Sequence, residues 1–146
     1  RHTRCSRDWS SDVCSSDLLN QGNVGSGKQK AAELFMQCRQ VSTAMHYFHL
    51  TTSSYSAHKA SNEFYLEIVE LADNFAETFI GRYGKFEAMP NVKIQPVNDG
   101  LTIVVNFLQW IDSNRYSITD DSEIQNIIDE ISGLCSSTIY KLRELK

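Results

Sequence analysis

The stretch SAHKASNEFYLEIVELADNFAETFIGRY, residues 56–83, decides the fold class of this chain. Its apolar residues recur every three or four positions, which is the period of an amphipathic α-helix. They are Phe64, Ile68, Leu71, Phe75 and Phe79 on one side, with Val69, Ala72, Ala76 and Ile80 beside them. A helix with so wide an apolar face usually contacts two neighbours at once. The stretch therefore predicts a helix inside a bundle, and Gly84 fits its C-terminal stop.

The preceding helix is predicted over residues 29–50, where apolar residues again recur at helical spacing. TTSSYS, residues 51–56, breaks that pattern and supplies Ser and Thr for the next N-cap. The Gly-, Ser- and Asn-rich residues 19–28 are predicted to be a flexible lead-in. They contain Gly22-x-x-x-x-Gly27-Lys28, but Gln29 stands where a phosphate-binding P-loop needs Ser or Thr, and no strand precedes the motif.

Two more helices are predicted toward the C-terminus. The third runs from Leu101 to about Asp112 and is capped by Asn98 or Asp99, although its TIVV run also favours a strand. The fourth begins at Thr119 or Asp120. Its apolar stripe is the most regular in the chain and consists of Ile124, Ile127, Ile128, Ile131, Leu134, Cys135, Ile139 and Leu142.

The connection KFEAMPNVKIQPVND, residues 85–99, contains both prolines and is the only long one predicted. Counted as roughly 14 residues at about 3.3 Å each, it can span about 45 Å, which is about the length of the second helix at 1.5 Å per residue. Short, long and short connections predict an all-α four-helix bundle with one long crossover between helices 2 and 3. This is the ferritin-like topology, and residues 29–146 form the domain.

The first 18 residues are predicted to be foreign to the biological chain. DWSSDVCSSDL, residues 8–18, has no helical or strand period, and its back-translation resembles the constant end of a short-read sequencing adapter. RHTR, residues 1–4, resembles the preceding constant part of the same primer. We therefore interpret residues 1–18 as an adapter-derived, disordered artefact and exclude them from the fold. This interpretation implies a metagenomic fragment whose true start is missing.

Composition narrows the class of protein. With 14 basic and 18 acidic residues the net charge is −4, which makes DNA an unlikely partner. No apolar run is long enough to span a membrane, and no secretory signal opens the chain. Outside residues 1–18 the cysteines are Cys38 and Cys135, at apolar positions of helices. They are expected to be reduced core residues, which favours a cytoplasmic location.

The remaining histidines, His46, His49 and His58, lie within 13 residues of one another. His49 falls in the middle of the apolar stripe of the first helix, whereas His46 falls on its flank. Asp73 is flanked by apolar residues of the second helix, and a carboxylate in such a place needs a partner, a metal or a proton.

The polar residues of the second helix follow a mirror-symmetric spacing. Asn62, Asp73 and Glu77 lie within about 100° of His58 on a helical wheel, but His58 and Glu77 are about 28 Å apart along the axis. They therefore cannot share a metal within one chain. Antiparallel pairing with a twofold copy would set His58 and Asn62 against the partner's Asp73 and Glu77. An isologous dimer with two equivalent sites follows, and such ligands suit iron, manganese or zinc.

The segment HLTTSSYSAHKASNEFYLEIVELADNFAE, residues 49–77, resembles the mini-ferritins, the starvation-induced Dps proteins. Their pattern is a His followed by an aromatic residue on the first helix, then His-x3-Asp and Asp-x3-Glu on the second. The segment is still more similar to an uncharacterised group of small tailed-phage proteins. These carry His-Trp-x-Thr-x-Ser-Tyr-x-x-His and end with Glu-x-x-x-Gly-Arg/Lys-Tyr-Gly, here ETFIGRYG from Glu77. The resemblance covers roughly residues 30–85.

The mini-ferritin resemblance implies an iron site with ferroxidase activity at a twofold interface, and iron storage in a larger shell. By this resemblance His49 and His58 are metal ligands from one chain, and Asp73 and Glu77 are ligands from its partner. His46 is the alternative ligand from the first helix, because its interval to His58 matches the longer mini-ferritin loop.

The sequence also departs from the mini-ferritin pattern. Asn62 stands where the family has an aspartate ligand, and Glu63 is the alternative for that role. Leu50 replaces the aromatic residue after His49. These departures favour the alternative function, a non-enzymatic phage helical bundle that acts in assembly or protein interaction. Enzyme activity therefore stays open, and no catalytic residue is expected beyond the metal ligands. The expected setting is the cytoplasm of a bacterial host, with the gene carried by a phage.

Overall fold

The computed structural model of the protein describes residues 21–146, with side chains from residue 27 onward. It contains four helices, α3 (Gln21–Thr51), α4 (Tyr55–Tyr83), α5 (Gly100–Ile118) and α6 (Ser122–Glu144). No strand occurs between residues 21 and 146. The predicted adapter-derived segment lies outside the described residues.

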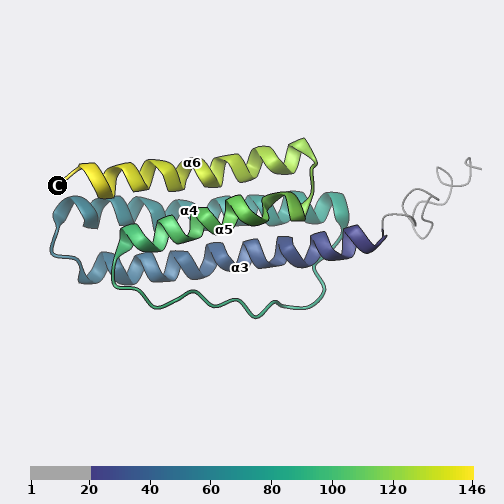
Figure 1. Cartoon of the computed structure of the whole chain (residues 1–146), viewed down its shortest axis with the longest axis horizontal. Helices are drawn as coiled ribbons and strands as arrows, with labels where there is room; N and C mark the ends of the chain where they lie inside the picture. Colours follow the sequence, from purple (N-terminus) through teal and green to yellow (C-terminus); the bar gives the residue numbers. More distant parts are fainter. Residues whose placement is uncertain (1–20) are drawn as a thin grey trace, which may run out of the picture.

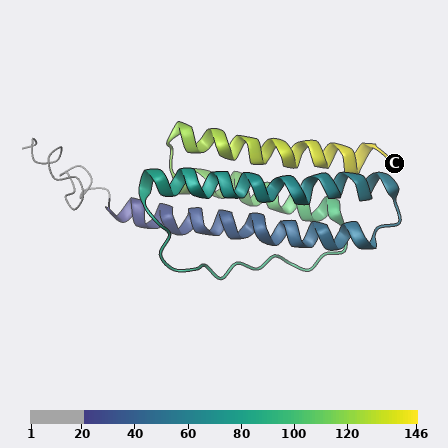
Figure 2. The same cartoon turned by 180° about the vertical axis from the view of Figure 1, so that it is seen from behind.

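The helices form a bundle in which α3 and α6 each pack against both α4 and α5. In both views the packed neighbours run antiparallel, and the connection from α4 to α5 runs back along the whole bundle (Figures 1 and 2). This connection, residues 84–99, is called the crossover below. The predicted all-α four-helix bundle with one long crossover is confirmed. The order in which the helices are connected does not by itself identify a function.

All four helices contribute to one apolar core. Its largest fully buried side chains include Leu34 and Met45 of α3, Phe64, Phe75 and Phe79 of α4, Val104 and Ile111 of α5, and Ile124, Ile128 and Ile131 of α6. Cys38 and Cys135 are buried in this core as free thiols, as predicted. Burial raises the pKa of Cys135 to about 12 and raises the pKa of Cys38 further above its usual range.

Side-chain caps and one glycine set most of the helix ends. Ser54 accepts a hydrogen bond from the backbone N–H of Ala57 at the start of α4, and Asp99 does the same for Thr102 in α5. Asp121, rather than the predicted Thr119 or Asp120, caps α6. Gly84 ends α4 with a φ of 92°, a conformation that favours glycine over residues with a Cβ.

Two predicted boundaries were wrong because tertiary packing outweighs local propensity. The predicted flexible lead-in is helical from Gln21 onward. Gly27 lies against the backbone carbonyl of Ile118, where a Cβ would have no room, so this glycine serves close helix packing. At the other boundary, α5 extends six residues beyond Asp112 and buries Ile118.

The turn between α5 and α6 is closed by a buried amide. The Gln125 side chain donates to the backbone carbonyls of Arg115 (2.9 Å) and Thr119 (2.6 Å) and accepts a hydrogen bond from Arg115 Nε (2.7 Å). The hydroxyl of Tyr83, at the end of α4, reaches the same turn and donates to Asp121. Among the described helices none is long and apolar enough to cross a membrane.

Candidate metal centre

The tight turn between α3 and α4 brings His49 and His58 into contact. Their rings stack with centroids 3.7 Å apart and planes 21° apart. His49 Nδ1 lies 2.9 Å from the backbone oxygen of His58, and His58 Nδ1 lies 2.9 Å from that of His49. Since a carbonyl oxygen can only accept, each Nδ1 is the donor. In the neutral rings both Nε2 atoms then carry the free lone pair.

This arrangement suits metal ligation. A histidine that binds metal through one ring nitrogen usually donates its other N–H to a carbonyl or carboxylate, which fixes the tautomer and the ring orientation. In the part of the chain that the structure describes, neither Nε2 has a hydrogen-bond partner. His49 and His58 therefore present two free ring nitrogens at one end of the bundle.

Tyr65 links the other predicted residues to this pair. Its ring stacks on His46 with centroids 4.1 Å apart and meets His49 edge-on at 5.3 Å. Its hydroxyl donates to Asn62 Oδ1 at 3.0 Å. The sequence analysis did not single out Tyr65, although its position three residues after Asn62, on the side of α4 toward α3, would have placed it there.

The alternative ligands have other partners in the structure. The exposed ring of His46 is 6.0 Å from that of His49. The Asn62 oxygen already accepts a hydrogen bond. Glu63 forms an ion pair with Lys141 of α6 at 3.1 Å and so points to a different neighbour.

Asp73 and Glu77 lie far from the histidine pair along α4. Both are exposed, and within residues 27–146 neither takes part in an ion pair. Over the same residues no group of three or more His, Cys, Asp or Glu side chains is placed to hold a metal ion. One chain thus brings together the two histidines but not the carboxylates, which agrees with the 28 Å limit set by the helical rise, about 1.5 Å per residue.

The apolar residues beside Asp73 lie at the surface of the chain. Leu66 is 58% exposed and Tyr55 is 75% exposed, while Val69 and Ile80 are half-buried. We call this side of α4 the outer stripe; it comprises Tyr55, His58, Asn62, Leu66, Val69, Asp73, Glu77 and Ile80. At 100° per residue these eight residues share about 100° of the helix circumference.

The outer stripe is mirror-symmetric about the point between Glu67 and Ile68. Equal steps in both directions from this point pair Leu66 with Val69, Asn62 with Asp73, His58 with Glu77 and Tyr55 with Ile80. An antiparallel copy of α4 would therefore oppose apolar with apolar residues at the centre and at the ends. Between the centre and the ends, it would place Asn62 opposite Asp73 and His58 opposite Glu77.

The fold and the histidine pair define a small helical-bundle protein with a candidate metal centre. Residues 49–142 match the model of a family of unknown function, DUF5856, and the chain belongs to this family. The matched span begins at His49 and reaches into α6.

A relative in Enterobacteria phage T4 was also found. It is described as an uncharacterised 14.6 kDa protein in the mobD–ri intergenic region. It is 28% identical over 120 residues, which cover 80% of this chain and 91% of the phage protein. The predicted similarity to uncharacterised phage proteins is confirmed, whereas these matches give no support to the mini-ferritin family. No solved structure matches the chain significantly.

Proposed function

We propose that the protein is an isologous homodimer, paired through α4, that binds a divalent transition metal at two sites shared between subunits. His49 and His58 of one subunit and Asp73 and Glu77 of the other are the ligands. The observation that carries the proposal is the histidine pair, whose N–H groups are held by backbone carbonyls so that both Nε2 lone pairs are free.

The outer stripe supports the twofold pairing. Its centre is apolar, with Leu66 exposed and Val69 half-buried, which suits a self-complementary contact. The mirror spacing sets the partner's Glu77 opposite His58 and the partner's Asp73 opposite Asn62. Asp73 and Glu77 are exposed, and within residues 27–146 no ion pair compensates their charge. A divalent ion between two imidazoles and two carboxylates would neutralise it.

Iron is the metal we expect first, because two imidazoles and two carboxylates suit iron, manganese or zinc and the spacing resembles that of mini-ferritins. With Fe(II) as substrate and oxygen or peroxide as oxidant, the protein would be a ferroxidase-type oxidoreductase that sequesters iron. The chain's own residues bind and orient the ion. Since Asn62 is uncharged and already accepts from Tyr65, it adds no third carboxylate.

Anaerobic titration of the full chain with Fe(II) tests the proposal. We expect saturable binding of one ion per chain, followed by ferric absorbance when oxygen is added. Removing two of four ligands with the Asp73→Asn/Glu77→Gln variant should weaken binding at least about tenfold. The matched control is Asp112→Asn/Glu130→Gln, which alters two exposed carboxylates on α5 and α6 and should bind like the wild type.

Mixing two inactive variants tests whether the site is shared between subunits. His58→Ala lacks the histidine side, and Asp73→Ala/Glu77→Ala lacks the carboxylate side. A heterodimer of the two variants has one intact and one doubly defective site, so a random mixture should recover about a quarter of the wild-type sites. Recovery of none, with dimers still present, would show that the site is not shared.

The alternative function predicts a different set of results. A wild-type dimer without saturable Fe(II), Mn(II) or Zn(II) binding would make the outer stripe a packing surface only. The protein would then be a non-enzymatic helical bundle that acts in assembly or protein interaction.

A further inference from the structure

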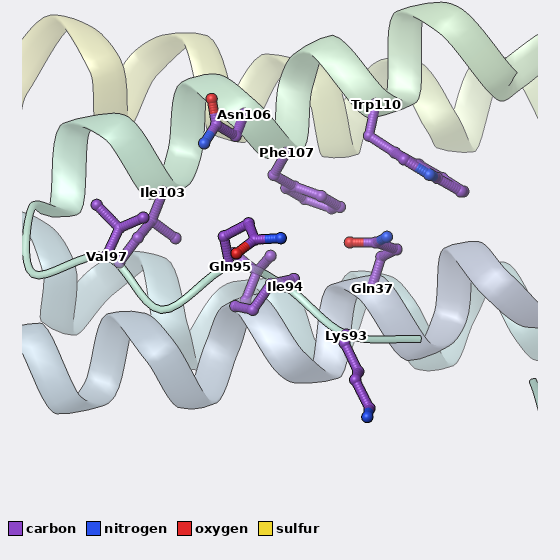
Figure 3. Close-up of a pocket in the computed structure, with 10 residues that line it drawn as sticks. Gln37, Lys93, Ile94, Gln95, Val97, Ile103, Asn106, Phe107 and Trp110 are labelled. Carbon is purple, nitrogen blue, oxygen red and sulfur yellow. The ribbon is translucent and has the colours of Figure 1, made fainter. Parts of the chain in front are cut away.

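A cavity of about 160 Å³ lies between α3, α5 and the crossover, away from the histidine pair (Figure 3). Its apolar lining residues are Val41, Ile94, Val97, Ile103, Phe107 and Trp110. An apolar protein cavity of about 150 Å³ can hold benzene. The volume therefore suits a single ring.

Two aromatic side chains of α5 shape the cavity for a flat ligand. Phe107 is buried, and the half-buried ring of Trp110 has the ammonium of Lys30 5.9 Å from its centroid. Figure 3 shows the Phe107 ring extending from α5 toward Gln37 and Gln95, and the Trp110 ring farther along the same helix. Aromatic rings favour stacked or edge-on contact with another planar ring.

Carboxamides supply the polar part of the lining. Gln37 of α3 is half-buried, and Gln95 of the crossover and Asn106 of α5 lie exposed at the rim. None of the three side-chain amides has a hydrogen-bond partner among the residues that the structure describes. A carboxamide can donate and accept at once, so it can pair with a ligand edge that does the same.

The charge of the lining limits the ligand further. Of the lining residues in the described part of the chain only Lys93 is charged, and its ammonium extends away from the ring side chains (Figure 3). Within residues 27–146 no carboxylate lines the cavity to bind a cation. The crossover wall is itself held in place, because the Gln40 side chain donates to the backbone carbonyl of Val92. A neutral ligand fits this lining better than a metal ion or an amine.

We propose that this cavity binds a planar, uncharged heterocycle of one ring with an amide-like edge, such as a pyrimidine base. Gln37 pairs with the polar edge, and Phe107 and Trp110 contact the ring. The proposal is independent of the metal centre, because it involves neither the outer stripe nor the histidine pair.

Uracil is the probe for an NMR titration of the full chain. The chain has two indole N–H signals, from Trp9 and Trp110, and Trp110→Phe assigns them. We expect uracil to shift the Trp110 signal saturably, with a Kd on the order of 0.1 to 1 mM for a ligand of this size, and to leave the Trp9 signal unchanged. Gln37→Leu should weaken binding about 3- to 10-fold, the loss expected for one neutral hydrogen bond.

Two further variants and a second probe keep the test decisive. Val97→Phe fills the cavity from the crossover and should abolish the shift, whereas Gln109→Leu, which alters an exposed amide of α5 outside the cavity, should leave it intact. Binding of benzene without uracil would mean an apolar void only and would overturn the proposal. Equal uracil affinity of the wild type and of the Gln37→Leu and Val97→Phe variants would also overturn it.

Discussion

At the scale of single residues, the backbone sets the chemistry of the histidine pair. His49 and His58 each donate to the other's carbonyl, so neither ring can rotate without losing a hydrogen bond. The stacked rings add a second constraint on orientation. Both rings are therefore held in one orientation within the single chain.

The two buried thiols predict a loss of stability at alkaline pH. Folding raises the pKa of Cys135 to about 12 and that of Cys38 further, compared with about 8.5 for an exposed thiol. The stability that the two neutral, buried thiols contribute is complete below the thiol pKa of the unfolded chain. It is lost as the pH rises above that value toward the thiol pKa of the folded chain. In Cys135→Ala the free energy of unfolding should fall less steeply with rising pH than in the wild type. The two slopes should differ by at most about 1.4 kcal/mol per pH unit.

Urea unfolding at roughly pH 8 to 11, a range that spans the unfolded thiol pKa, measures this slope. Val104→Ala is the control, because it shortens another buried side chain without removing a titrating group. It should lower stability at every pH and keep the wild-type slope. Identical slopes for Cys135→Ala and the wild type would contradict the prediction.

At the scale of helices, the first turns of α3 depend on a close contact with the end of α5. The Gly27 backbone lies on the Ile118 carbonyl, and a backbone atom cannot rotate away from an added Cβ. We expect Gly27→Ala to destabilise the protein by about 1 to 3 kcal/mol through overpacking, although alanine is the better helix former.

Gly133→Ala is the matched control for this prediction. Gly133 lies inside α6 and a Cβ there would meet nothing within 4 Å. The same substitution should therefore stabilise the protein by up to about 1 kcal/mol. Thermal unfolding of both variants gives the comparison, and stabilisation of both would refute the close packing of Gly27.

At the scale of the whole molecule, one side of α4 has apolar residues that residues 27–146 leave partly uncovered. The helix packs its core face against α3 and α6, while Leu66 remains 58% exposed on the outer stripe. The mirror spacing favours a second copy of the chain as the partner on this surface. Each apolar residue of the outer stripe would then face an apolar residue of the copy, and each His or Asn would face a carboxylate.

Leu66→Glu should convert the proposed dimer to a monomer. The substitution places two carboxylates near the twofold axis, where they would be desolvated and repel each other. Because Leu66 is exposed in the single chain, unfolding of the monomer should change by less than about 0.5 kcal/mol. Light scattering gives the mass, and Tyr140→Glu, at a 55% exposed residue of α6, is the control that should stay dimeric. A dimeric Leu66→Glu variant would exclude the outer stripe as the interface.

The sequence by itself determined the helices and the crossover. Apolar periodicity, the Ser54 and Asp99 caps and the Gly84 stop act within a few residues, and the length of the crossover follows from chain geometry. The burial of Cys38 and Cys135 was predictable for the same reason. The candidate ligands could be found from their spacing, because the rise of a helix is fixed.

Only the tertiary structure decided the start of α3, the hydrogen bonds of His49 and His58, and the cavity beside Trp110. The start of α3 and the cavity depend on which distant segments meet, such as Gly27 with Ile118 or α3 with the crossover. The histidine hydrogen bonds depend on the geometry of the turn between α3 and α4. Local propensities for glycine, histidine and glutamine carry no signal of such contacts. Packing between helices supplies the free energy that outweighs those propensities, which is why residues predicted to be flexible became helical.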